Sequence, residues 1–141
     1  MWAHVTLIYP FRDSSLLSDE AARGVADVVA RFTSFRFRLA TTNYLRSPRV
    51  VLYLEPEPTA PFENLTRALA AAFPDTPPYG GAFEDVVPHL SVADAQDTDL
   101  LATIAADLSP RLPIDATARE VQLVELAADG WQLRRRFELH A

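Results

Sequence analysis

One four-residue pattern occurs twice in this sequence: a histidine, an apolar residue, a hydroxyl residue and a second apolar residue. It reads HVTL at residues 4–7 and HLSV at residues 89–92. Side chains two apart on a β-strand point the same way, so each copy would place an imidazole beside a hydroxyl on one face. The pattern therefore predicts two strands of similar construction, one at the start of the chain and one beyond its middle.

The rest of the chain alternates between helical and strand-like spacing. Apolar residues at helical spacing predict helices over 18–32, 62–73 and 97–108. Apolar runs and period-two alternation predict strands over 4–11, 35–39, 50–54, 89–93, 113–127 and 131–139, the last two joined by a hairpin at Asp129-Gly130. Prolines and glycines mark residues 74–87 as a loop that we expect to cover a site. The predicted element order is β-α-β-β-α-β-α-β-β.

Length and composition narrow the class of protein. With 141 residues, 1–141 is predicted to form a single domain. The formal net charge is −6, with 13 arginines and no lysine, which argues against an extended nucleic-acid surface. The chain has no cysteine and four glycines, which excludes thiolate chemistry and glycine-rich phosphate loops. No apolar run approaches the ~20 residues of a membrane span, and we expect a cytoplasmic protein without a membrane partner.

Two histidines with two hydroxyls suit reactions at a phosphate. Such reactions need a base for the incoming oxygen, an acid for the departing one, and donors for the non-bridging oxygens. Imidazole fills either proton role near neutral pH, and a neighbouring hydroxyl can donate to the phosphoryl oxygens. A metal site is the competing use, but no acidic or third histidine ligand accompanies both motifs. We therefore expect no cofactor and no metal ligands.

The sequence resembles the two-histidine (2H) phosphoesterases, also called the 2'-5' RNA ligase or LigT-like superfamily. The resemblance lies in HVTL and HLSV, in Tyr9-Pro10-Phe11 after the first motif, in the proline before the second histidine, and in a closing hairpin ending WQLRRRFEL. It implies an α+β fold with two similar lobes, mainly antiparallel sheets, outer helices and a central cleft. It also implies a 2',3'-cyclic phosphodiesterase-type hydrolase for an RNA end or small nucleotide, with no metal.

Carried over by position, the resemblance makes His4 and His89 the catalytic acid-base pair and lets Thr6 and Ser91 hold the phosphate. Which histidine is the acid is left open, as is the oligomeric state. Phe11 and Tyr53 are candidates to line a base or sugar pocket by stacking, with core packing as the other interpretation.

A non-catalytic phosphate- or nucleotide-binding module on the same fold is the alternative function. Two departures from the family motivate it. Only three residues precede His4, where many relatives carry a further strand and helix, and Asp94 stands where relatives often have an arginine. Both histidines as ordinary core residues would be a third, purely structural interpretation.

Overall fold

The computed structural model describes residues 3–46, 49–77, 81 and 87–141. Its helices are η1 (Ser14–Leu16), α1 (Asp19–Val29), α2 (Ala60–Ala72), α3 (Thr98–Leu108) and η3 (Ser109–Arg111). Its strands are β1 (Phe35–Arg46), β2 (Val50–Glu57), β3 (Leu90–Ala95), β4 (Ile114–Ala118), β5 (Glu120–Ala127) and β6 (Gly130–Glu138). Of the helices in the described ranges, none has the length and apolar character needed to cross a membrane.

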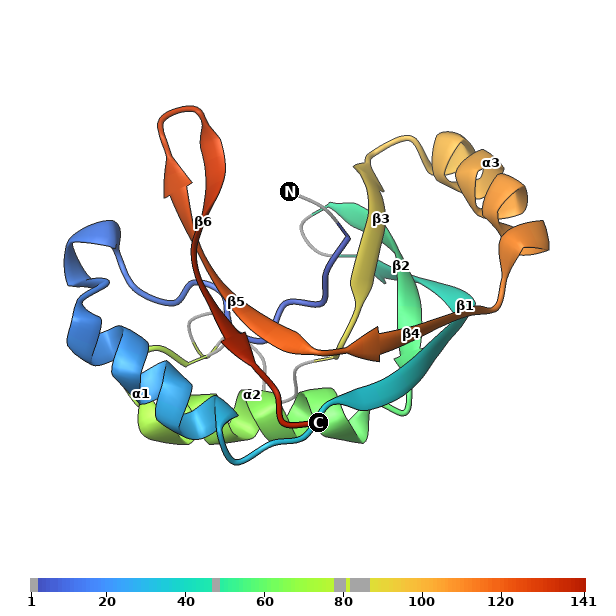
Figure 1. The fold of residues 1–141 in the computed structure, drawn as a ribbon. Helices are drawn as coiled ribbons and strands as arrows, with labels where there is room; N and C mark the ends of the chain where they lie inside the picture. Colours follow the sequence, from blue (N-terminus) through green and yellow to red (C-terminus); the bar gives the residue numbers. More distant parts are fainter. Residues whose placement is uncertain (1–2, 47–48, 78–80, 82–86) are drawn as a thin grey trace.

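The strands form two antiparallel sheets that divide the molecule into two lobes (Figure 1). One lobe holds a four-stranded sheet in the order β3-β2-β1-β4, with α3 packed on the outer side of β2 and β3. The other holds the β5–β6 hairpin, with α1 packed against β6 and α2. The expected α+β class, with mainly antiparallel sheets and outer helices, is confirmed.

Local sequence signals explain the helix starts and the hairpin. The Ser18 hydroxyl accepts a hydrogen bond from the Ala21 amide, and the Asp97 carboxylate accepts bonds from two amides at the start of α3. Such caps satisfy donors that have no partner inside the helix. Gly130, at φ +119°, allows the tight turn between β5 and β6 that Asp129-Gly130 predicts.

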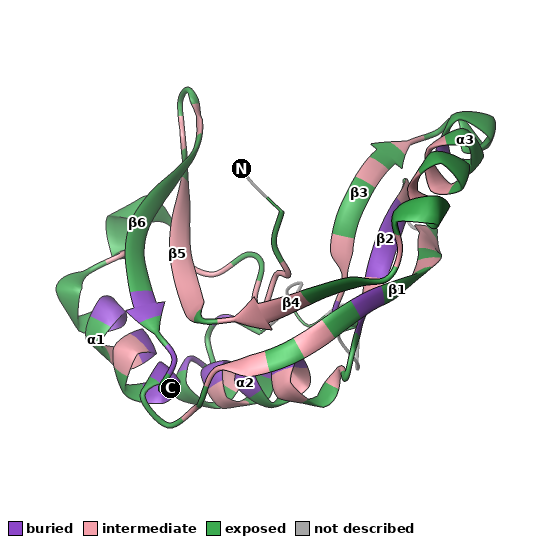
Figure 2. Ribbon diagram, turned by 45° about the vertical axis from the view of Figure 1, so that its right-hand side comes forward, coloured by how far each residue is buried: buried purple, intermediate pink, exposed green. Residues whose placement is uncertain are grey.

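The main core lies where α1, α2 and the hairpin meet, as the buried residues in Figure 2 show. Val25 and Val29 of α1 pack there with Leu65 and Leu69 of α2. Gly24 lets the two helices approach, because a Cβ atom at that position would lie 2.8 Å from the Phe73 ring. In the other lobe, Leu52 of β2 and Leu101 of α3 are fully buried.

The first predicted strand, over 4–11, is wrong. Residues 3–12, which we call the N-terminal segment, are irregular and run between β5 and β3 (Figure 1). The apolar run in this segment reflects burial without strand pairing, since Leu7, Ile8 and Phe11 pack against the main core. Pro10 also lacks the amide donor that a strand ladder would need.

The single strand predicted over 113–127 is also wrong, because it divides at Arg119 into β4 and β5. β4 pairs with β1 and β5 pairs with β6, so the chain changes from one sheet to the other at this point. The first predicted helix ends earlier, at Val29, and β1 continues to Arg46, well beyond the predicted Leu39. Most of the predicted covering loop, 74–87, lies outside the described residues.

Candidate functional site

The second motif is fixed by a regular strand ladder. Residues 90–95 form β3, an edge strand that pairs with β2 and places Ser91 opposite Tyr53. His89 directly precedes the strand, and its ring meets the Tyr53 ring edge-on at a centroid distance of 5.5 Å. Opposite residues of a ladder share a face. The His89 imidazole and the Ser91 hydroxyl therefore lie on the same face of the sheet formed by β2 and β3, the face that carries Tyr53.

The His89 ring is oriented by its own backbone neighbourhood. Its Nδ1 atom lies 2.7 Å from the carbonyl oxygen of Val87. A carbonyl oxygen only accepts hydrogen bonds, so Nδ1 carries a proton in this contact. The Nε2 atom is then the nitrogen left to accept or release a proton, which is the arrangement that general acid-base chemistry requires.

Tyr53 supports this histidine from within the sheet. Only 4% of Tyr53 is exposed. Burial first, and then the negative charge of Glu55, raises the pKa of the Tyr53 phenol above its ordinary value. The phenol is neutral at neutral pH, and the buried ring packs edge-on against the His89 ring.

The first motif has no strand ladder and is held by helix α2 instead. The Thr66 hydroxyl of α2 donates a hydrogen bond of 3.1 Å to the carbonyl oxygen of Leu7. Thr66 is buried, whereas His4 is exposed and Thr6 is half-buried. The hydrogen bond fixes the backbone one residue after Thr6, so α2 sets the position of the first motif.

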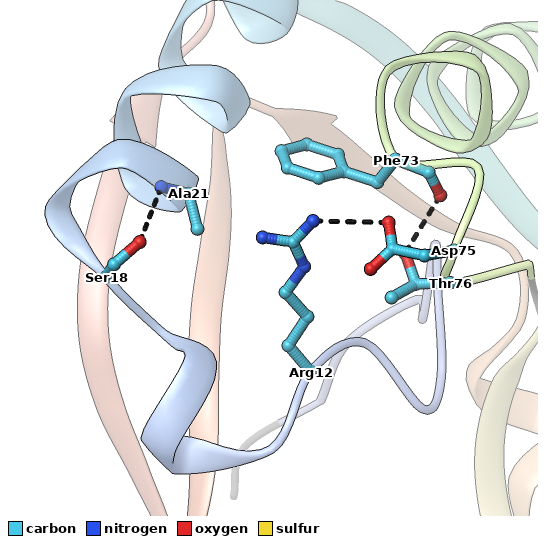
Figure 3. A network of polar contacts seen from close by, with 6 residues as sticks. All are labelled: Arg12, Ser18, Ala21, Phe73, Asp75 and Thr76. Atoms are coloured by element: carbon cyan, nitrogen blue, oxygen red, sulfur yellow. Dashed lines mark hydrogen bonds and ion pairs between the residues drawn. The ribbon is translucent and has the colours of Figure 1, made fainter.

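A polar network anchors the other end of the N-terminal segment (Figure 3). The Arg12 guanidinium forms an ion pair of 3.2 Å with Asp75, just beyond the end of α2. It also lies over the Phe73 ring, 5.0 Å from the centroid. Phe11 meets the same ring edge-on at 5.0 Å. Phe11 is thus half-buried against the main core and also borders the cleft described next.

A cleft of about 850 Å³ lies between the N-terminal segment, the hairpin and the four-stranded sheet. His4, Thr6 and Phe11 line it, together with Leu90 of the second motif. The structure thus brings both motif-bearing segments to one cleft. His89, Ser91 and Tyr53 are not part of its wall and lie on the adjoining part of β2 and β3.

One charged residue near the second motif forms an ion pair. Asp94, close to the second motif, forms an ion pair of 2.8 Å with Arg49. The described part of the chain contains no group of three His, Asp or Glu side chains able to hold a metal ion.

Three residues that hold the first motif or line the cleft could not be identified from the sequence. Thr66 is one threonine in an amphipathic helix, and only the fold brings it to Leu7. Tyr9 and Trp131 also line the cleft. In the sequence both belong to stretches that carry the family resemblance, Tyr9-Pro10-Phe11 and WQLRRRFEL, but neither residue is predicted there as a site residue.

Comparisons with known proteins agree with this architecture. The model of the 2'-5' RNA ligase superfamily matches residues 1–130. TT0787 of Thermus thermophilus has 22% sequence identity and a TM-score of 0.64, over 97% of this chain and 78% of its own. E. coli LigT, solved in complex with NADP+, has 17% identity and a TM-score of 0.58, over 99% and 77%. A crystallised phosphoesterase has 18% identity and a TM-score of 0.56, over 99% and 78%.

At these identities the three solved structures share the fold with this chain, which confirms the expected LigT-like architecture. The search of curated proteins finds no match.

Proposed function

We propose that this chain, which belongs to the 2'-5' RNA ligase superfamily, is a metal-independent cyclic phosphodiesterase acting by His/His acid-base catalysis. Its substrate is a 2',3'-cyclic phosphate, or a related cyclic phosphodiester, on an RNA end or a small nucleotide. The observation that carries the proposal is the duplicated histidine-hydroxyl motif. His4 and Thr6 of the first copy line the cleft, and Leu90 of the second copy borders it, with His89 and Ser91 on the adjoining part of the sheet.

In the proposed reaction, one imidazole takes a proton from water as the water oxygen attacks phosphorus. The bond between phosphorus and one ribose oxygen breaks, and the other imidazole protonates that oxygen. Thr6 and Ser91 donate hydrogen bonds to the non-bridging oxygens, where negative charge builds up. The product is a 2'- or 3'-phosphomonoester. For His89, the Nε2 atom performs the proton transfer, because Nδ1 is engaged by the Val87 carbonyl.

The charge of the chain supports a small substrate. A formal net charge of −6 argues against the broad positive surface that long nucleic acids bind. A nucleotide or an RNA end held locally in the cleft is compatible with this negative net charge. The reaction as proposed runs in the cytoplasm and needs neither a cofactor nor a membrane.

The test is turnover of 2',3'-cyclic mononucleotides and cyclic-phosphate-ended oligonucleotides in EDTA. We expect the wild type to release a phosphomonoester and the His4→Ala/His89→Ala double variant to be inactive. His140→Ala is the matched control, because His140 contributes backbone hydrogen bonds to the chain end and belongs to neither motif. Binding of these substrates by the wild type without turnover would overturn the proposal in favour of a non-catalytic binding module.

A further inference from the structure

One carboxylate lies in the wall of the cleft. Most of the described residues that line the cleft are apolar, and Glu120 is the single acidic one among them. A carboxylate repels the phosphate on which the two motifs are proposed to act, so Glu120 does not help to hold that group. The Glu120 side chain therefore either has no role in the cleft or contacts a different part of the substrate.

The strand β5 directs this carboxylate away from the core. Glu120 and Gln122 lie two residues apart on β5, so their side chains share a face of the hairpin. Val121, between them, belongs to the opposite face and packs against the main core. Both Glu120 and Gln122 line the cleft. The strand thus presents a carboxylate and an amide side by side to the space that His4 and Thr6 also line.

Two neighbours orient the Glu120 carboxylate. The Gln122 amide donates a hydrogen bond to its Oε1 atom. Arg136, opposite Gln122 in the hairpin ladder, places its Nε atom 3.9 Å from the same oxygen. Both contacts reach Oε1, so the lone pairs of Oε2 remain for a ligand. Because the Glu120 side chain is 31% exposed, a ligand in the cleft can reach this oriented acceptor.

The chemistry of a carboxylate limits what it can bind. A carboxylate accepts hydrogen bonds and donates none, so it selects a group that carries donors. The guanine edge presents two adjacent donors, N1–H and the 2-amino group, which both oxygens of one carboxylate can accept. Adenine and cytosine place a single amino group beside an acceptor nitrogen, and uracil places a single N–H between two carbonyl oxygens. Of the four RNA bases, guanine therefore matches a carboxylate best.

We infer that Glu120 recognises the edge of the nucleobase and favours guanine, so that the preferred substrate is a guanosine 2',3'-cyclic phosphate, free or at an RNA end. The inference rests on the proposed function. Gln122 is a positioning residue, because its amide holds the Glu120 carboxylate in the cleft wall. With a volume of about 850 Å³, the cleft can accommodate a base together with its ribose and phosphate.

The kinetic test compares guanosine 2',3'-cyclic phosphate with inosine 2',3'-cyclic phosphate, which lacks only the 2-amino group. We expect the wild type to show a KM about tenfold higher for the inosine substrate, because one hydrogen bond to a charged acceptor is lost. Glu120→Gln should reduce this ratio to about one, since its side chain has one acceptor oxygen instead of two. The ratio cancels any general effect of removing a negative charge. Gln122→Met, which keeps the carboxylate but removes the amide that orients it, should lower the ratio only in part.

Glu138→Gln is the matched control. Glu138 lies directly opposite Glu120 in the hairpin ladder and is exposed, but it is not among the described residues that line the cleft. This variant removes the same charge from the same strand pair and should keep the full ratio between the two substrates. Equal KM values for the two substrates in the wild type, or a ratio that survives in Glu120→Gln, would overturn the recognition of guanine while leaving the phosphodiesterase intact.

A binding measurement separates the two proposals if turnover fails. Calorimetric titration uses the same two cyclic phosphates with the wild type, Glu120→Gln and Glu138→Gln. A Kd about tenfold lower for the guanosine compound, lost in Glu120→Gln and kept in Glu138→Gln, would support recognition of guanine without catalysis. Equal Kd values for the two compounds in the wild type, or no binding of either compound, would overturn it.

Discussion

The same four-residue motif occupies two different backbone settings in this molecule. The second copy is built into an edge strand, with Ser91 opposite Tyr53 and a ladder along β2. The first copy lies in an irregular segment whose position depends on Thr66 and Arg12. A strand-like sequence thus becomes a strand where a neighbour offers a ladder, and stays irregular where side chains of a helix take over the anchoring.

The two motifs should differ in how easily a substitution displaces them. The ladder of β3 involves several residues at once, so a single substitution beside it changes little. The N-terminal segment has no such ladder in the described structure; the Thr66 hydrogen bond from α2, the Arg12 ion pair near its end and apolar packing contribute to holding it. We therefore expect the first motif to be the more easily displaced of the two.

The largest expected effect comes from the histidines themselves. His4→Ala and His89→Ala should each lower kcat at least 10²-fold on a 2',3'-cyclic nucleotide, because each removes one proton-transfer partner. The double variant should lose less than the product of the two single losses, since the residues act as a unit. Steady-state kinetics check this, with His140→Ala as the control. A small loss in either single variant would show that only one motif serves catalysis.

Thr66→Val tests the hydrogen bond that holds the first motif. It keeps the shape of the side chain but removes the donor to the Leu7 carbonyl, so we expect a loss of about 1 kcal/mol in the free energy of unfolding. We also expect kcat to fall about tenfold, because the first motif is displaced. Denaturant unfolding and kinetics measure the two effects.

Thr103→Val is the matched control for this variant, because the Thr103 hydroxyl donates to the Asp99 carbonyl within α3, in the other lobe. It should leave kcat unchanged. The kcat loss of Thr66→Val should disappear in a His4→Ala background and persist in a His89→Ala background. Persistence in both backgrounds would contradict a specific role for α2 in placing the first motif.

Arg12 is expected to have a smaller effect on stability. Arg12→Ala removes the stacking on Phe73 and the ion pair with Asp75, which together are worth about 1–2 kcal/mol. Asp75→Asn removes the ion pair alone and should cost less, because the Asp75 side chain is 60% exposed. Thermal unfolding of the two variants measures the difference. Equal losses would show that the ion pair, rather than the ring contact, anchors the segment.

The smallest expected effect lies in the other lobe, between β1 and β4. Arg38 forms a two-pronged contact with Asp115 on the surface, and its hydrogen bond and charge lower the pKa of the Asp115 carboxyl. A lowered pKa in the folded state stabilises the protein above the ordinary carboxyl pKa, and this contribution disappears as the pH falls through the folded value. Asp115→Asn should make the acid-induced fall in Tm slightly shallower between pH 5 and pH 2. An unchanged Tm profile would show that solvent screens the pair completely.

The sequence predicts the elements whose signals are local. Ser18 and Asp97 mark helix starts, and Asp129-Gly130 marks a hairpin, because capping and turn geometry depend on neighbouring residues alone. The division of 113–127 into two strands could not be predicted in this way. Neither glycine nor proline interrupts the alternation around Arg119, and the change of sheet depends on pairing with β1 and β6.

The candidate site, like the fold, could be predicted from the sequence only where its signal is local. The duplicated motif is visible in the sequence and leads to the family. The hydrogen bond of Thr66 to Leu7 and the contact of Tyr9 with Trp131 become visible only when α2, the N-terminal segment and the hairpin are brought together. Tyr53, predicted from its apolar strand as a candidate for substrate stacking or core packing, lies buried beside His89, and its role in substrate binding stays a prediction.

The central claim is that both motifs act on one phosphate, and histidine side-chain NMR during ligand titration tests it most directly. The probes are adenosine 2'-monophosphate and adenosine 3'-monophosphate, the two possible products, added in turn to the wild type. The account predicts that the imidazole signals of His4 and His89 shift together with one Kd, while the signal of His140 stays in place. A shift of only one motif histidine, or shifts with two different Kd values, would contradict it.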